Sequence, residues 1–285
     1  MASTSEPILI FVLPGSQFTA KVLAALQQRK IDHYIAYVPF DEAKRRKFIP
    51  SGGLLVPEMQ VGKLKENPTI VSDSELILHW IDDNRQAGLY PFEQCSEISK
   101  RASDGKLAGL VFYYNWVQEK GFRASMLPTA KQTLPRTAQC IVPNFVFARA
   151  LSSTRQKFRG KTLKAIGMDE SDESILSQED KMKQILIDEL VFFQSLLQTD
   201  EQPYLIPQTT QPTAADFSVY AQLERLVGEG TASDVTVYPA CQELYEEQKE
   251  TLGRLWKWYQ HMRKTCPVQF KGKRPPAELL SSEDD

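Results

Sequence analysis

The chain has 285 residues, of which 42% are hydrophobic and 25% charged, as is usual for a globular protein of one large or two ordinary domains. Its formal net charge of −2 gives no basic field that would indicate nucleic acid as a partner. The widely separated cysteines, the lack of a secretory leader after Met1 and the lack of an apolar run of about 18 residues predict a cytoplasmic protein without a membrane span. The three histidines lack metal-ligand spacing, so no metal site is predicted.

The first informative segment is a strand that turns into a helix. The apolar run Ile8–Leu13 predicts a strand, and the helical spacing after it predicts a helix over Phe18–Arg29. Between them, Pro14, Gly15 and Ser16 form a turn that presents the Ser16 hydroxyl and free backbone N–H groups at the helix N-terminus. This end of a helix favours an anion such as a thiolate, although a helix cap also explains Ser16.

The next elements are a strand at His33–Val38, a helix at Asp41–Phe48 and a strand at Leu54–Val61. Pro57 lies inside the last of these runs. Because proline cannot donate to a sheet ladder, Pro57 marks an edge or the entrance of the strand. The bond from Val56 to Pro57 is a candidate for the cis form.

A strand at Thr69–Ser72 and an amphipathic helix at Asp73–Arg85 complete this half of the chain. Asp73 and Ser74 stand at the start of the helix, where residues of both types act as caps. The same carboxylate and hydroxyl also suit the amino and carboxyl groups of a small zwitterion.

In order and spacing these segments resemble the thioredoxin-like domain of the cytosolic glutathione transferases. That family has a turn bearing Ser, Cys or Tyr before the first helix, Val and cis-Pro before the third strand, and an acidic residue with Ser at the third helix. Ser16, the Val56-Pro57 pair and the Asp73-Ser74 pair stand at these positions. The chain resembles a serine-type member, similar to the tau and omega classes.

The resemblance implies roles for these residues. Ser16 would be the catalytic residue that stabilises the glutathione thiolate, and without a cysteine there the mixed-disulfide chemistry of omega-type members is excluded. The glutathione site would contain Phe18, Val56, Pro57, Asp73 and Ser74. A basic residue among Lys44, Arg45, Arg46 and Lys47 would reach the glycyl carboxylate, although such a charge run is usually a solvated helix face.

Beyond a polar linker the pattern is helical, with candidate helices at Ser99–Lys120, Phe145–Phe158, Gln178–Leu197, Thr213–Val227 and Glu243–Lys264. Tyr113, Tyr114 and Trp116 in the first of them form either core or the wall of a hydrophobic substrate cleft. Thr213 and Asp216 form a capping box that we interpret as structural. It is similar to the box that folds the helical domain of glutathione transferases.

The predicted fold class is an α/β thioredoxin-like domain followed by an all-α domain, the glutathione transferase fold. The thioredoxin-like domain covers residues 1–85, the linker 86–98, the helical domain 99–270 and a tail 271–285. An insertion around residues 122–180 resembles the extended helical domains of metaxin-like and some fungal or algal relatives, not all of which are known as enzymes.

The resemblance implies a cytoplasmic glutathione transferase that works in detoxification. It would activate the thiol of its co-substrate glutathione for attack on a small apolar electrophile, and the family's usual assembly is a homodimer. Two alternatives stay open: a protein of this fold without turnover, which carries ligands or scaffolds partners, and a specialised glutathione-dependent lyase or isomerase.

Overall fold

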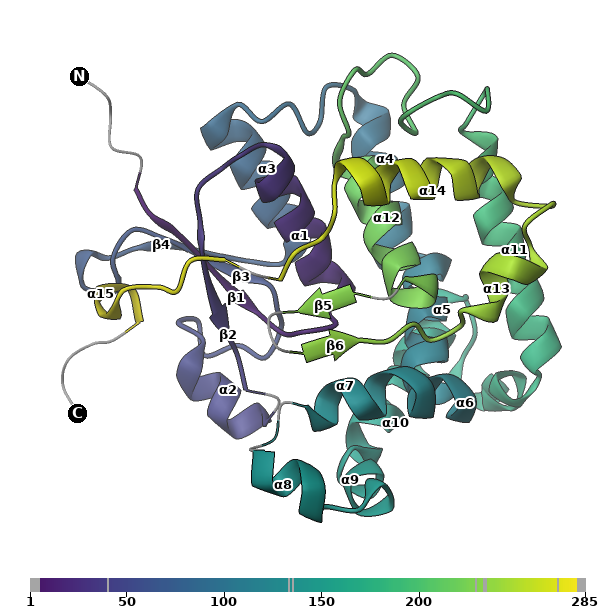
Figure 1. Ribbon diagram of the computed structural model, residues 1–285, viewed down its shortest axis with the longest axis horizontal. Coiled ribbons are helices and arrows are strands. Elements are labelled where there is room, and N and C mark those ends of the chain that lie inside the picture. The colour runs from purple at the N-terminus through teal and green to yellow at the C-terminus, as the bar shows by residue number, and fades with distance from the viewer. Residues whose placement is uncertain are drawn as a thin grey trace.

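The computed structural model describes residues 6–39, 41–132, 134, 136–228, 230–232, 235–270 and 272–280. A four-stranded sheet with its helices lies beside a larger helical part (Figure 1). The sheet has the strand order β2-β1-β3-β4. Its elements are β1 (Ile8–Val12), α1 (Gln17–Gln28), β2 (Tyr34–Tyr37), α2 (Glu42–Phe48), β3 (Glu58–Val61), β4 (Thr69–Ser72) and α3 (Ser74–Arg85).

The sheet is mixed. β1 pairs in parallel with β2 through the crossover helix α1, whereas β1 with β3 and β3 with β4 are antiparallel pairs. All five residues of β1 are buried, which explains its unbroken apolar sequence. β3 begins at Glu58 rather than at Leu54, after a cis bond between Val56 and Pro57.

The helical part begins earlier than the sequence predicts and is more divided. Gly105 ends α4, and a Cβ there would lie 2.4 Å from the carbonyl oxygen of Arg101, so the backbone at this break favours glycine. The elements are α4 (Glu93–Asp104), α5 (Lys106–Phe112), α6 (Glu119–Gly121), α7 (Leu127–Lys131), α8 (Arg136–Ile141), α9 (Asn144–Ala150), α10 (Ser152–Ala165), α11 (Glu179–Ser195), α12 (Ala214–Val227), the hairpin β5 (Gly230–Ala232) and β6 (Val235–Val237), α13 (Glu243–Glu247), α14 (Gly253–Thr265) and α15 (Ala277–Leu280).

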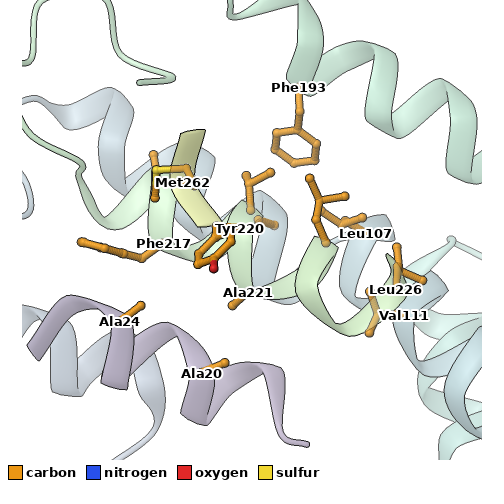
Figure 2. Close-up of a cluster of buried hydrophobic side chains, with 14 of the residues drawn as sticks. Ala20, Ala24, Leu107, Val111, Phe193, Phe217, Tyr220, Ala221, Leu226 and Met262 are labelled. Carbon is orange, nitrogen blue, oxygen red and sulfur yellow. The ribbon is translucent and has the colours of Figure 1, made fainter. Parts of the chain in front are cut away.

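The two parts meet where α1 packs on α12. Figure 2 shows Ala20 and Ala24 of α1 facing the helix that carries Tyr220 and Ala221. Small side chains on α1 let the two helices approach closely, and all four residues are buried. The N-terminus of α1 is thereby held against the helical part.

Helix α12 begins at a fully buried cap. The Asp216 carboxylate accepts hydrogen bonds from the backbone N–H groups of Leu205 (2.7 Å) and Thr213 (2.8 Å) and from the Trp258 indole (3.3 Å). The Thr213 hydroxyl also donates to it at 2.9 Å. Burial raises the pKa of Asp216, and these hydrogen bonds act in the opposite direction.

The described residues near the C-terminus lie along the sheet, although the sequence suggests a tail there. Tyr34 of β2 forms a bridge with Lys273, and the Ile35 N–H donates to the Lys273 carbonyl at 3.1 Å. Leu279 of α15 is buried with Leu9 and Phe11. None of the helices in the described ranges combines the length and the apolar character that a bilayer crossing requires.

Candidate functional site

Ser16 is the N-cap of α1. Its Oγ accepts a hydrogen bond from the Thr19 N–H at 3.3 Å, and its side chain is partly exposed. Within the described part of the chain, the hydroxyl proton of Ser16 has no acceptor. Gly15 before it has φ +80°, which favours glycine in this turn. A donor is therefore available at the positive end of a twelve-residue helix.

A cleft of about 470 Å³ lies next to this helix end, between the sheet and the helical part. It brings together all five residues assigned above to a glutathione site. Its walls on the side of the sheet are Phe18, Leu55, Val56, Pro57, Asp73, Ser74 and Glu75. Its walls on the helical side are Ser103, Asp104, Ala108, Gly109, Phe112, Lys161, Lys164 and Ala165.

Asp73 has an unusual backbone for a non-glycine residue, with φ 86° and ψ 133°. Its side chain caps α3 by accepting the Glu75 N–H at 2.7 Å, and it is exposed. Backbone strain of this kind, about 1–3 kcal/mol, persists where surrounding structure enforces it and is common in binding sites. Ser74 beside it is buried, and nothing in the described residues hydrogen-bonds the backbone of Val56.

A second carboxylate in the cleft, Asp104, comes from the end of α4. Burial, and then the negative charge of Asp73, raises the pKa of Asp104. Two neighbouring carboxylates in the cleft wall form a place for a cation such as an ammonium group. The sequence contains no signal for Asp104, because 31 residues separate it from Asp73 and only the domain packing brings them together.

The positive charges in the cleft come from the insertion. Lys161 and Lys164 of α10 line it, with the Lys161 Nζ 5.6 Å from the ring centre of Phe112. Burial lowers the pKa of Lys161, and the charge of Lys157 adds to this. The basic run Lys44–Lys47 is not part of the cleft wall, and within it Arg45 donates to the carbonyls of Pro39 and Leu54.

The aromatic run lies mainly in the core. Tyr113 and Tyr114 are buried in the main hydrophobic cluster, and Trp116 stacks on Phe158 with 4.7 Å between ring centres. Phe112 is the neighbour that lines the cleft. The π-helical turn Tyr113–Val117 changes the helical phase after Phe112, so the three aromatic side chains behind it turn inward.

Ser16 itself lies in the wall of a smaller hollow of about 40 Å³, shared with Arg225 and Phe270. Arg225 is buried, and burial lowers its pKa to about 9. Its guanidinium donates to the Tyr238 carbonyl at 2.8 Å and contacts the sulfur of Met126. No carboxylate is recorded as its partner in the described ranges. A Cβ on Gly15 would be 3.8 Å from Arg225 Cζ, so an unneutralised cation adjoins the turn.

A buried ionic network lies behind the cleft. The Lys21 Nζ is 2.7 Å from the Glu75 carboxylate and donates to the Ser103 hydroxyl at 3.0 Å. Tyr90 and Ser99 also donate to Glu75, at 2.7 and 2.8 Å. The network ties α1 and α3 to α4. Among the described residues, no group of three or more His, Cys, Asp or Glu side chains is suited to a metal ion.

Several proteins of known structure have a fold similar to that of this chain. No protein-family model matches the chain, and no curated protein sequence matches it. Glutathione transferase GSTFuA2 from Phanerochaete chrysosporium is similar, with a TM-score of 0.56 and 15% identity over 93% of this chain and 100% of that one. The β-etherase LigF from Sphingobium sp. strain SYK-6 has a TM-score of 0.54 and 15% identity, over 90% of this chain and 94% of that one. The predicted fold class is thus confirmed: the chain has the glutathione transferase fold, a thioredoxin-like domain followed by a helical domain.

Proposed function

We propose that this protein binds glutathione in the cleft and activates its thiol for attack on a small apolar electrophile. The observation that carries the proposal is the Ser16 hydroxyl, whose proton lacks an acceptor among the described residues. It stands at the N-terminus of α1, two residues before Phe18 of the cleft. The proposed setting is the cytoplasm, where thiols are kept reduced.

The γ-glutamyl and cysteinyl units of glutathione have matching groups in the cleft. The α-ammonium of its γ-glutamyl unit fits Asp73 and Asp104, and the neighbouring carboxylate fits the hydroxyl of Ser74. The free backbone groups of Val56 suit the cysteinyl unit, because an extended peptide pairs with unpaired N–H and C=O groups. Phe112 supplies an apolar wall for the electrophile.

Thiol activation needs two contributions. A free thiol has a pKa near 8.5, and lowering it by about two units requires roughly 2.7 kcal/mol of preference for the thiolate. A helix N-terminus supplies about 0.3–1 kcal/mol and a hydrogen bond to a charged group about 1.5–3 kcal/mol. The Ser16 hydroxyl and the end of α1 together reach the required range, and the charge of Arg225 acts in the same direction.

The chemistry then balances without another cofactor. The thiol proton leaves to solvent, and the thiolate sulfur donates an electron pair to an electrophilic carbon. A carbon–sulfur bond forms, and the leaving group departs with the electron pair of the bond that breaks. The similarity to a β-etherase favours, as a second candidate, the same attack on a carbon that carries an ether oxygen, which leaves as an alkoxide or phenoxide.

Binding of glutathione tests the first step of the proposal. Calorimetric titration with glutathione is expected to show saturable binding, and Asp73→Ala is expected to weaken it about tenfold because a charge-assisted contact is lost. Glu250→Ala, an exposed carboxylate on another part of the surface, is the matched control and leaves affinity unchanged. Equal affinity for both variants would remove Asp73 from the binding site.

A further inference from the structure

Charge is distributed unevenly along this chain. Residues 122–167 contain nine of its 34 lysines and arginines and none of its 36 aspartates and glutamates. Some of these cations are paired with acids from elsewhere, as Arg155 is with Glu119 at 2.9 Å. The segment as a whole still carries a strong positive excess, on a protein whose net charge is slightly negative.

Three large apolar side chains are exposed in the same segment. Ile141 at the end of α8 is 76% exposed, and Phe145 and Val146 in α9 are 75% and 46% exposed. The opposite side of α9 is held by packing, because Phe147 and Ala148 contact the cluster around Trp116. The helix is therefore anchored on one side while its apolar outer side stays uncovered.

Helices α8 and α9 lie where a large, flat partner can contact them. Figure 1 shows α8 and α9 at the lower margin of the molecule, away from the sheet. We call this part, residues 136–150 together with Lys131, the basic corner. Exposed apolar side chains gathered at such a margin usually mark an interaction site.

The charges next to these apolar side chains are positive. Arg149, which is exposed, lies one helical turn after Phe145. A groove of about 300 Å³ adjoins α9 and contains Lys131 and Arg123 but no acidic residue, and Arg123 is paired with Glu119 outside the groove at 2.6 Å. The Lys131 Nζ donates to the neutral side chain of Asn144 at 2.9 Å, so this contact leaves its charge unneutralised.

We propose that the basic corner docks on the surface of an anionic lipid bilayer. Ile141, Phe145 and Val146 would enter the boundary between headgroups and acyl chains, while Lys131 and Arg149 contact lipid phosphates. This combination of apolar insertion and cationic attraction is how peripheral proteins bind such membranes. The inference is independent of the proposed glutathione chemistry.

Two other partners fit the corner less well. A second copy of the chain docked through the same face would bring two positive segments together, because a two-fold contact places like surfaces opposite each other. The phosphates of a nucleic acid would pair with the cations, but a nucleic acid offers no apolar environment for Ile141 and Val146. A bilayer with anionic lipid accommodates both features.

Vesicle co-sedimentation tests this proposal. The protein is expected to sediment with vesicles of equal parts phosphatidylcholine and phosphatidylserine, and to stay in solution with phosphatidylcholine alone. Added salt weakens the binding because the attraction is screened. The double variants Ile141→Asp/Phe145→Asp and Lys131→Gln/Arg149→Gln should each lose at least tenfold in the partition coefficient.

Matched variants on distant surfaces control for general effects. Leu76→Asp changes an exposed apolar side chain elsewhere, 59% exposed on α3, and Lys249→Gln/Lys257→Gln removes two exposed lysines from the region of α13 and α14. Both should sediment as the unchanged protein does, and all variants should retain its circular dichroism spectrum and melting temperature. Absence of sedimentation with the anionic vesicles, or undiminished sedimentation of the corner variants, would overturn the proposal. Dimerisation or RNA binding that depends on Phe145, without vesicle binding, would overturn it as well.

Discussion

Lys21 and Glu75 form an ion pair between the first and third helices, with the Lys21 Nζ 2.7 Å from the Glu75 carboxylate. The lysine side chain is 1% exposed and the glutamate side chain 23%. Ser16 precedes α1 and Asp73 precedes α3, so the pair fixes the two helix starts of the candidate site relative to each other. The ion pair, which lies behind the cleft, therefore helps to set the geometry of the site.

Removing one partner of this pair should destabilise the fold strongly. Lys21→Met is expected to lower the free energy of unfolding by about 3–5 kcal/mol, because it leaves a half-buried carboxylate without its cation. Urea unfolding measures the change. Lys63→Met, which breaks an exposed pair with Glu66, should leave the unfolding midpoint nearly unchanged. Similar unfolding midpoints for the two variants would show that the buried ion pair stabilises the fold no more than the exposed pair does.

Because of the same ion pair, the stability of the fold should decrease at acid pH. Burial alone would raise the pKa of Glu75, but the charge of Lys21 and the hydrogen bonds from Lys21, Tyr90 and Ser99 outweigh it and hold the pKa below its ordinary value. The ionised carboxylate therefore contributes stability above the pKa of the unfolded chain, and this is lost as pH falls through the folded pKa. Glu75→Gln should be less stable than the unchanged protein at neutral pH, and the gap should close below about pH 4.5. A gap independent of pH would contradict this explanation.

The buried cap of α12 supports folding rather than binding. Asp216→Ala should cost about 2–4 kcal/mol, since the N–H groups of Leu205 and Thr213 would remain buried without an acceptor. Glutathione affinity, measured at a temperature where the variant is folded, should stay within about twofold of the original. Loss of affinity in a well-folded variant would make Asp216 part of the site.

Arg225 offers a test of electrostatics at the turn. Arg225→Met is expected to raise the pKa of the bound glutathione thiol, because it removes the buried cation beside Gly15. Arg225→Lys keeps the charge and should have a smaller effect. Measured thiol pKa values that do not separate the two variants would assign Arg225 a packing role only.

The sequence predicted the fold well where local patterns are strong. The apolar run of β1, the proline before β3 and the capped start of α3 are local signals, and each stands where expected. Asp104, Lys161 and Arg225 carry no such signal, because only the packing of distant helices brings them to the cleft and the turn. The hairpin β5–β6 was missed because its strands have only three residues each.

The central claim is that the Ser16 hydroxyl donates a hydrogen bond to a glutathione thiolate. Ultraviolet absorbance of the thiolate, followed through a pH titration of the protein with bound glutathione, measures this directly. The bound thiol pKa should lie about two units below the free value near 8.5. Ser16→Ala should raise it by about one to two units, with affinity within a few-fold, and Ser16→Thr should retain most of the effect. A bound thiol that titrates as free glutathione does, or an unchanged pKa in Ser16→Ala, would contradict the claim and leave Ser16 as a helix cap.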